Sequence, residues 1–552
     1  MKNKLPKFLL ILFIFLIAIF FRTYRLGQAP KGMLVDEPSL AYNAYLILKT
    51  GKDEFGNKLP VIFKSFGDYK LPGYIYATVF PVKFFGLNTF SARLPSIVSG
   101  IILIFILFFL LKELGFGFYY RALGMLITAV SPWTIILSRF TWEANLGLVI
   151  LAAALLFLIK GVKYKKPLYF TVAGILIALS SYSYHPYLFV PFAISILFSI
   201  YSFFKKNLSL RQLLFFLVPM IFVAIPLLIT VFSGDGLRRF KQVNIFTNPQ
   251  NTVIVNENRT YCVLTDKKTL CYLNSNKLFE YIKIMSNNFV NIFSVKYLFF
   301  SGETEKFIGV ENFGLFPHFL FVFYLFGLFF LISRKKDKNN FDSLIILGLI
   351  LYSLPSVVSE PQRIRLTPLY IFILITILYG FDYLSKHFRN FLSKLLVIFL
   401  LIGFGFFYIF NYINIHANKY QMEWNFSEDI MNYLKTKKNY DIYFDDLLSE
   451  PLMYYAFYNV VDPFLYQRSI QLGERDAIGY QHVTKLGNVY FTPSISPAQV
   501  CKVKKSSSPA IYVTNENLKE ISPIHVLKSA NGIHSMVFFY NVKDLYQSNK
   551  CL

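Results

Sequence analysis

Long apolar runs separated by short basic segments dominate the chain. A helix that crosses a membrane needs roughly 20 mostly apolar residues, because about 1.5 Å of rise per residue must span about 30 Å of hydrocarbon. Eleven stretches meet this requirement and predict spanning helices. They lie near residues 7–22, 93–111, 120–137, 145–160, 167–183, 187–204, 212–232, 315–333, 341–357, 366–383 and 393–411. The first is followed by bulky, basic residues rather than a cleavage site, so we expect it to be retained.

Three segments outside these stretches are too long to be simple connections. They are residues 23–92, 233–314 and 412–552. In the first of them the pattern predicts a helix over 38–48, with Asp36 or Glu37 as its N-cap and Gly51 beyond its end.

The C-terminal segment has a different pattern, because no further apolar span occurs in it. Ser427 opens a predicted short helix, and four runs alternate in the manner of strands. These runs are 440–444, 488–492, 510–514 and 536–540. We therefore predict an α-helical polytopic membrane domain over 1–411, followed by a small α/β domain over 412–552.

Composition agrees with a membrane protein. Of the 552 residues, 55% are hydrophobic and only 16% are charged, which argues against several soluble domains. The formal net charge of +25, from 56 basic and 31 acidic residues, would suggest nucleic acid if it formed one face of a soluble fold. Here the basic residues punctuate apolar runs instead, so we expect membrane lipids and no nucleic acid as partners.

The basic residues also predict the orientation of the chain. Short cytoplasmic loops carry an excess of Lys and Arg, and every alternate loop of the eleven-span arrangement is basic, beginning with Lys2, Lys4 and Lys7. The N-terminus is then cytoplasmic. Because the number of spans is odd, the C-terminal domain lies outside, and we expect a multi-pass protein of the plasma membrane.

All four cysteines lie in segments that this topology places outside. Cys262 and Cys271 fall in the 233–314 loop, and Cys501 and Cys551 in the C-terminal segment. An even number on the oxidising face predicts two disulfides, Cys262–Cys271 and Cys501–Cys551. The alternative is four free thiols. Metal binding by these cysteines is not expected, because no close Cys or His spacing accompanies them.

Charged side chains near the predicted outer ends of the spans are candidates for chemistry, because charges at membrane depth are costly and usually line a cavity. These candidates comprise three carboxylates and five cations. They are Asp36, Glu37, Glu143, Lys70, Arg93, Arg139, Arg363 and Arg365.

Such a set suits the transfer of a sugar from a lipid phosphate. A carboxylate would deprotonate the acceptor, and cations would hold the phosphate and stabilise its charge as it leaves. Each residue also has a plainer interpretation. Asp36 could cap a helix, Lys70 and Arg93 could bind lipid headgroups, and Arg363 and Arg365 could end a span.

The order of several short segments carries a family resemblance. The segments are Asp36-Glu37, Lys70-Leu71-Pro72-Gly73-Tyr74-Ile75-Tyr76, Phe85-Gly86, Ser91-Ala92-Arg93-Leu94-Pro95-Ser96, Ser131-Pro132 and Ser138-Arg139. In this order they resemble the GT-C membrane glycosyltransferases. Within these the chain is similar to the bacterial group like protein O-mannosyltransferases, which includes the aminoarabinose transferase of lipid A and rhizobial lipopolysaccharide sugar transferases.

The resemblance covers roughly residues 1–383 and implies roles for individual residues. It implies Asp36 as the catalytic base beside Glu37, and Glu143 as the acidic residue of the second loop. It also implies Lys70 and either Arg363 or Arg365 as ligands of the donor phosphate. Arg93 and Arg139 are further candidate phosphate ligands from the set of charges near the outer ends of the spans. Leu71 stands where the family has the first proline of a Lys-Pro-Pro segment, which departs from the pattern at Lys70.

We therefore expect an integral membrane glycosyltransferase that transfers a hexose or pentose from a polyprenyl-phosphate donor, with inversion, to an extracytoplasmic lipid, glycan or protein of the cell envelope. The sequence identifies no certain cofactor and leaves metal dependence open: a divalent ion could bind Asp36 or Glu37, but no Asp-x-Asp or His cluster demands one. The alternatives are a transporter or flippase of envelope lipids or glycans, and a non-catalytic assembly protein. A transporter would typically show repeats and broken midplane helices, and the sequence shows neither.

Overall fold

The structure is a computed structural model. It describes residues 5–65, 68–205, 207–232, 244–264, 267–302, 308–333, 341–385, 391–419, 427–445, 450–475, 481–491, 509–519, 521–528 and 536–547. The chain forms two compact units. The helical unit comprises 1–22, 98–138 and 142–409, and the α/β unit comprises 23–97, 139–141 and 410–552. The boundary predicted at 411 thus separates only part of the second unit, because the first long loop belongs to it as well.

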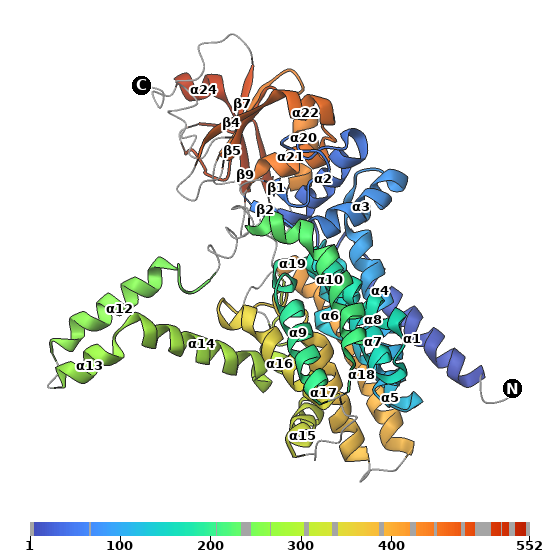
Figure 1. The fold of residues 1–552 in the computed structure, drawn as a ribbon. Helices are drawn as coiled ribbons and strands as arrows, with labels where there is room; N and C mark the ends of the chain where they lie inside the picture. The colour runs from blue at the N-terminus through green and yellow to red at the C-terminus, as the bar shows by residue number, and fades with distance from the viewer. Residues whose placement is uncertain are drawn as a thin grey trace. The chain divides into compact units, whose positions relative to one another are not determined.

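Each of the eleven predicted spans coincides with apolar helix in the structure (Figure 1). The helices are α1 (Leu5–Thr23), α4 (Thr89–Glu113), α5 (Phe118–Val130), α6 (Pro132–Arg139), α7 (Glu143–Tyr164), α8 (Pro167–Ser181), α9 (Val190–Phe204), α10 (Leu210–Phe232), α15 (Leu320–Ser333), α16 (Asp342–Val357), α17 (Leu369–Ser385) and α18 (Phe391–Asn411). Among the described residues, six helices are long and apolar enough to cross a membrane, or seven with α5 and α6 counted as one bent span. The helices α8, α15, α16 and α17 are apolar but shorter. A multi-pass helical membrane protein is thus confirmed, whereas a count of eleven full spans stays a prediction.

The third predicted span, 120–137, is broken where α5 meets α6, and its direction bends by 53° at this point. Pro132 has no N–H group, so the carbonyl oxygen of Thr128 loses its helical donor. The buried guanidinium of Arg22 and the Thr134 hydroxyl replace it: Arg22 Nη2 donates to Thr128 O over 3.1 Å, and Thr134 Oγ1 donates to the same oxygen. Arg22 Nη1 also donates to Ala129 O over 3.2 Å. Arg22 and Thr134 thus satisfy the backbone that the proline leaves open.

Two glycines allow α15 and α17 to pack backbone against backbone. A Cβ atom on Gly327 would lie 1.9 Å from Thr376 O, and one on Gly380 would lie 1.8 Å from Phe323 O. Any larger residue at either position would force the helices apart. Close approach through small residues is a common way for helices to associate within a membrane.

The first part of the α/β unit comes from the first long loop. It contains α2 (Asp36–Thr50), the antiparallel pair β1 (Phe63–Ser65) and β2 (Asp68–Lys70), and α3 (Pro72–Phe85). The helix predicted over 38–48 is present but begins earlier, so Asp36 and Glu37 are its first residues and not its N-cap. Gly51 follows the helix with a left-handed φ of 68°, as expected for a terminating glycine.

The C-terminal part of this unit is a seven-stranded sheet in the order β4-β5-β6-β3-β7-β9-β8. The strands β3, β6 and β7 are parallel, and the outer pairs are antiparallel. The strands are β3 (Asp441–Phe444), β4 (Ile470–Arg475), β5 (Gln481–Leu486), β6 (Val489–Phe491), β7 (Ala510–Thr514), β8 (His525–Lys528) and β9 (Met536–Asn541), and the helices are α20 (Ser427–Lys435), α21 (Pro451–Tyr458), α22 (Pro463–Ser469) and α24 (Val542–Gln547). The four predicted strands and the helix at Ser427 are all found.

One hydrophobic core joins the two parts of the α/β unit. Ala41, Tyr42 and Leu46 of α2 belong to the same buried cluster as Phe457 of α21 and Phe444 of the sheet. The other face of the sheet has a separate core around Tyr512 and Tyr540, because neighbouring residues on a strand point to opposite faces. The N-terminal helix α2 is therefore an integral part of the C-terminal domain's core.

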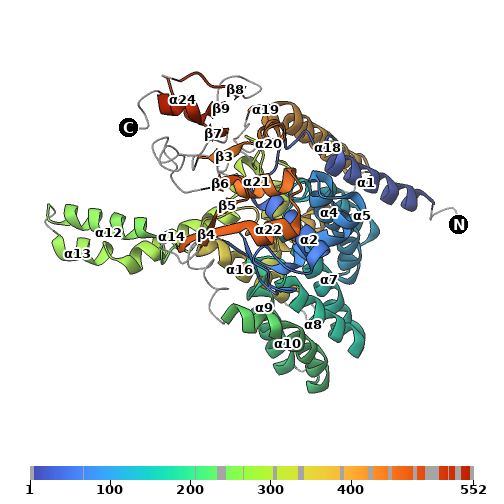
Figure 2. The ribbon, with the colours of Figure 1, turned by 90° about the horizontal axis from the view of Figure 1, so that it is seen from above.

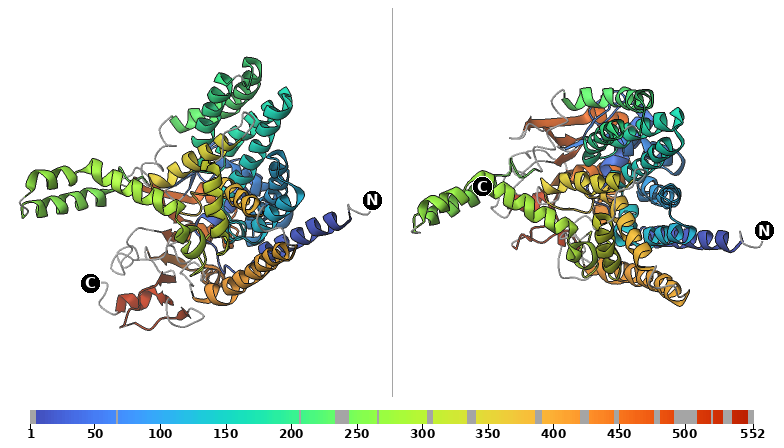
Figure 3. Two further views of the ribbon diagram at one scale, coloured as in Figure 1. Left: turned by 90° about the horizontal axis from the view of Figure 1, so that it is seen from below. Right: turned by 60° about the horizontal axis from the view of Figure 1, so that its bottom comes forward.

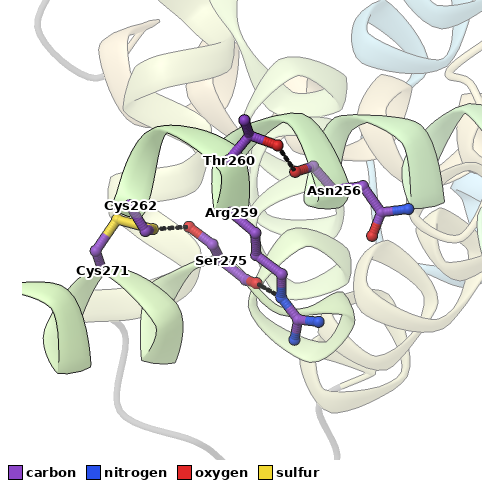
Figure 4. Close-up of a disulfide and its surroundings, with 6 residues drawn as sticks. All are labelled: Asn256, Arg259, Thr260, Cys262, Cys271 and Ser275. Carbon is purple, nitrogen blue, oxygen red and sulfur yellow. Dashed lines mark hydrogen bonds between the residues drawn. A yellow bond between two sulfur atoms is a disulfide. The ribbon is translucent and has the colours of Figure 1, made fainter. Parts of the chain in front are cut away.

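The long loop after α10 forms a helical hairpin in the helical unit. It contains α12 (Pro249–Cys262), α13 (Lys268–Asn274) and α14 (Lys277–Phe293). The predicted disulfide between Cys262 and Cys271 is present and joins α12 to α13 (Figure 4). Cys501 and Cys551 lie outside the described residues, so their disulfide stays a prediction.

Candidate active site

Asp36 and Lys70 form an ion pair in the α/β unit. Asp36 is the first residue of α2 and Lys70 is the last residue of β2, immediately before the Leu71-Pro72 step that starts α3. The Lys70 ammonium donates to Oδ1 of Asp36. The Asp36 side chain is 48% exposed, whereas that of Lys70 is only 4% exposed. The carboxylate is therefore accessible to a reactant.

Glu37 and Arg93 form a second ion pair, which is fully buried. The Glu37 carboxylate accepts two bonds from the guanidinium, from Nε and from Nη2, each of 2.9 Å. It also accepts bonds from the backbone N–H groups of Leu34, at 2.9 Å, and Thr141, at 2.8 Å. Neither side chain of the ion pair has exposed surface. A carboxylate enclosed in this way cannot contact an acceptor hydroxyl in this conformation.

The remaining donors of Arg93 hold the chain that leads into α2. Nη1 donates to the carbonyl oxygens of Leu26 and Pro30, and Nη2 donates to that of Gly32 at 2.6 Å. With the two bonds to Glu37, all five N–H groups of the guanidinium are used. Arg93 is thus placed to shape the loop before Asp36 and presents no donor to a lipid phosphate.

Arg139, in the short segment 139–141, donates hydrogen bonds to the same loop. Its guanidinium donates to the carbonyl oxygen of Ala29 through Nε, at 3.1 Å, and through Nη2, and Nη2 also donates to that of Tyr24 at 2.9 Å. Its side chain is fully buried and lies 5.5 Å from the ring centre of Tyr412. The structure therefore groups Arg139 with Arg93, as a residue that orders the approach to α2.

The C-terminal domain contacts the same helix from the other side. The Tyr454 hydroxyl of α21 donates to the carbonyl oxygen of Met33 at 2.9 Å, three residues before Asp36. The Tyr42 hydroxyl of α2 donates to the carbonyl oxygen of Val461 at 3.0 Å. Tyr454 could not be predicted from the sequence, because its partner is 421 residues away and no local pattern marks it.

Glu54 is a further buried carboxyl, and no pattern in the sequence marks it. It accepts bonds from the side chains of Asn43, Ser65, at 2.6 Å, and Tyr466, at 3.2 Å, and so connects α2, β1 and α22. Burial raises the pKa of Glu54 from 4.5 to about 7, although these hydrogen bonds oppose the rise. The carboxyl is therefore a titratable group inside the contact that supports α2.

We expect the Glu54→Gln variant to be more stable than the wild type at pH 8, by on the order of 3 kcal/mol. The unfolded chain releases this proton near pH 4.5 and the folded protein near pH 7, so the wild type loses stability as the pH rises between these values. The measurement is the unfolding midpoint of purified protein in detergent from pH 4.5 to 8. Glu428→Gln, at an exposed position of α20, is the control. An equal pH slope for wild type and Glu54→Gln would contradict the assignment.

The other predicted site residues belong to the helical unit. Glu143 is the first residue of α7 and is half-buried. Arg363 is buried and donates to the carbonyl oxygen of Ile308 at 3.4 Å, whereas Arg365 is half-buried and donates to that of Glu360 at 2.8 Å. Of these two arginines, Arg365 is thus the more accessible. Within the described part of the chain, no group of three or more His, Cys, Asp or Glu residues could hold a metal ion.

Comparison with known sequences identifies one family model. Residues 70–232 match the model described as dolichyl-phosphate-mannose-protein mannosyltransferase. The match begins at Lys70, includes Arg93, Arg139 and Glu143, and ends with the last residue of α10. No curated protein matches the chain at a significant level.

Comparison with solved structures identifies the fold. ArnT from Cupriavidus metallidurans, solved with undecaprenyl phosphate, matches with a TM-score of 0.57 at 12% identity over 96% of this chain and 97% of its own. AglB, the oligosaccharyltransferase from Archaeoglobus fulgidus solved with an inhibitory peptide and a dolichol-phosphate, gives a TM-score of 0.49 at 13% identity over 79% of this chain and 58% of its own. The predicted GT-C fold is thus confirmed by the match to ArnT, which extends over nearly the whole of both chains.

Proposed function

We propose that the protein is a glycosyltransferase that transfers a sugar from a polyprenyl-phosphate donor to an acceptor, with inversion at the anomeric carbon. The observation that carries this proposal is the Asp36–Lys70 pair, an accessible carboxylate beside a covered ammonium at the start of α2. The GT-C fold and the mannosyltransferase match support the reaction class. The undecaprenyl phosphate bound to ArnT supports a polyprenyl-phosphate donor.

Asp36 is the catalytic base in this proposal. Its carboxylate takes the proton of the acceptor hydroxyl or amine as the acceptor atom bonds to the anomeric carbon. The bond from that carbon to the phosphate oxygen breaks, and the polyprenyl phosphate leaves with the electron pair. A single displacement of this kind inverts the anomeric configuration. General-base catalysis by a placed side chain contributes typically 10²–10⁴-fold.

Lys70 is the proposed phosphate ligand. An ammonium group has three donors, so one Lys70 can hold Asp36 and a phosphate oxygen together. This arrangement places the base beside the leaving group and offsets the charge that grows on the phosphate. Arg365 is the proposed second cation, because it is the more accessible of the two arginines before α17.

Glu37, Arg93 and Arg139 take supporting roles in the proposal, in place of the contacts with substrate that the sequence suggested. Their buried contacts fix residues 24–34, which lead into Asp36. Glu143 is kept as a second candidate base. The alternation of basic loops supports a cytoplasmic N-terminus and an α/β unit outside the cytoplasm. In this proposal the protein belongs to the plasma membrane and its acceptor lies outside.

Lys70→Ala is expected to raise the KM for the lipid-phosphate donor roughly 10- to 150-fold, because a charge-assisted phosphate contact contributes about 1.5–3 kcal/mol. The measurement is the initial rate of transfer in nanodiscs at varied donor concentration. Lys31→Ala is the control, since Lys31 also pairs with an aspartate of the same unit, Asp429, but is 49% exposed. If the donor KM of Lys70→Ala equals that of the wild type, Lys70 does not bind the phosphate.

The acceptor and the sugar are identified by mass spectrometry of envelope glycolipids and glycoproteins from cells with and without the gene. We expect one sugar to be missing from a defined acceptor, with its lipid-phosphate donor accumulating. The cells could instead lack a whole lipid or glycan. If the purified protein moves that compound across vesicle membranes and transfers no sugar, the result supports a flippase.

A further inference from the structure

The hairpin α12–α14 extends away from the other helices of the helical unit, as the views from above and below both show (Figures 2 and 3). Its two arms are α12 on one side and α13 with α14 on the other. The Cys262–Cys271 disulfide closes its far end, where Arg259 also donates to the carbonyl oxygen of Ser275 at 2.7 Å (Figure 4). These contacts give the hairpin a fixed form of its own.

Large apolar side chains cover much of the hairpin without any protein against them. On α14 they form a stripe at helical spacing, with Leu278, Ile282 and Phe289 all exposed. At the far end Leu264 is 81% exposed and Tyr261 is 68% exposed. An exposed apolar surface of this extent indicates a surface that something covers.

The base of the hairpin is attached at the ends of apolar helices. Asn288 of α14 donates to the carbonyl oxygens of Val357, at 3.1 Å, and Ser359, at 2.9 Å, where α16 ends. The N–H group of Ile245 donates to the carbonyl oxygen of Val358 at 3.0 Å. The end of an apolar helix in a membrane protein lies near the boundary between hydrocarbon and headgroups. The hairpin therefore leaves the helical unit at the depth of the bilayer surface.

The hairpin also carries a net positive charge. Residues 249–293 contain five basic and three acidic residues. On α14, Glu280, Lys283 and Asn287 lie on the side away from the apolar stripe, as the 100° rotation per helical residue requires, and Lys283 pairs with Glu280 at 3.7 Å. A helical segment with an apolar stripe, a charged opposite face and a net positive charge is the form that binds in the plane of an anionic lipid surface.

We propose that the hairpin α12–α14 lies in the surface of the bilayer, with its apolar stripe among the lipid chains and its lysines among anionic headgroups. Both its depth and its charge favour lipid over a soluble partner. The hairpin thereby widens the footprint of the helical unit on the membrane. The proposal is independent of the transferase assignment, since it uses no residue of the candidate site.

The test is the environment of a nitroxide spin label on α14 in full-length protein in nanodiscs. Leu278→Cys carries the label on the apolar stripe, and Asn287→Cys carries it on the opposite face as the matched control. Labelling without reductant leaves the Cys262–Cys271 disulfide intact. With 30% phosphatidylglycerol in the nanodisc, we expect several-fold greater accessibility to oxygen than to a nickel chelate at Leu278→Cys. The control should show the reverse.

Three results would overturn the proposal. Equal accessibility to the nickel chelate at both positions would place the hairpin in water. Protection of Leu278→Cys from both relaxants, with dipolar broadening between labels, would show that a second copy of the chain covers the stripe. An oxygen-to-nickel ratio unchanged in phosphatidylcholine alone would show that the lysines do not bind anionic lipid. The readout does not require sugar transfer, so it is separate from the test of the proposed function.

Discussion

Asp36→Asn is expected to lower the rate of sugar transfer by about 10²–10⁴-fold while leaving the amount and thermal stability of the protein nearly unchanged. Asparagine keeps the size of the side chain and can still accept a hydrogen bond from Lys70, but it cannot take up the acceptor's proton. The loss should appear in kcat, whereas the Lys70→Ala change appears in the KM for the donor. The measurement is transfer by purified variants from a defined polyprenyl-phosphate sugar.

Asp429→Asn is the matched control for this variant. Asp429 is also a half-exposed aspartate of the α/β unit, 46% exposed, and it pairs with a lysine, Lys31, at 3.7 Å. Its replacement should leave the transfer rate unchanged. If Asp36→Asn retains most of the wild-type rate, Asp36 is not the base, and Glu143 becomes the candidate because Glu37 is enclosed.

Glu37→Ala is expected to destabilise the fold by roughly 3–5 kcal/mol, because it leaves the fully buried guanidinium of Arg93 without its counter-charge. It also leaves the N–H groups of Leu34 and Thr141 without their acceptor. The measurement is the unfolding midpoint of purified protein in detergent, together with the yield of folded protein. Asp429→Ala removes an exposed ion pair and should change stability by less than about 1 kcal/mol.

A double variant separates a structural role of Glu37 from a chemical one. Glu37→Leu combined with Arg93→Met replaces the buried pair with apolar side chains of similar volume, which often restores stability. We expect it to fold better than Glu37→Ala. A Glu37→Ala protein with wild-type stability but no transfer activity would contradict the structural role and would mean that Glu37 contacts the substrate.

The positions of the long apolar helices could be predicted from the sequence because each corresponds to a local run of apolar residues. The helices α12, α13, α14, α21, α22 and α24 were not predicted. The break within 120–137 had a local signal as well, the proline at position 132, but its effect on a single span was not anticipated. The four predicted strands follow from alternation. The strands β1, β2, β4, β5 and β8 were missed, since β1 and β2 are only three residues long and the others show no sustained alternation of apolar and polar residues.

The candidate site was predictable only in part. The sequence identifies Asp36 and Lys70 as polar residues beside predicted membrane segments, and the structure pairs them. It does not distinguish an accessible charge from an enclosed one, because enclosure depends on partners far along the chain. Arg93 meets Glu37 across 56 residues, and Arg139 meets Ala29 across 110. Four arginines that look alike in the sequence, Arg22, Arg93, Arg139 and Arg363, are consequently all buried in the fold.

The shared core of α2 and the C-terminal sheet affects how the protein matures during synthesis. Leu46 and Ile430 belong to the same core, but the ribosome adds Ile430 384 residues after Leu46. At about 5–20 residues per second, this takes roughly 20–80 s. Throughout that time the segment that carries Asp36 is joined to the growing membrane domain without the core that holds it. The core that contains α2 is thus completed only when the polypeptide is nearly finished.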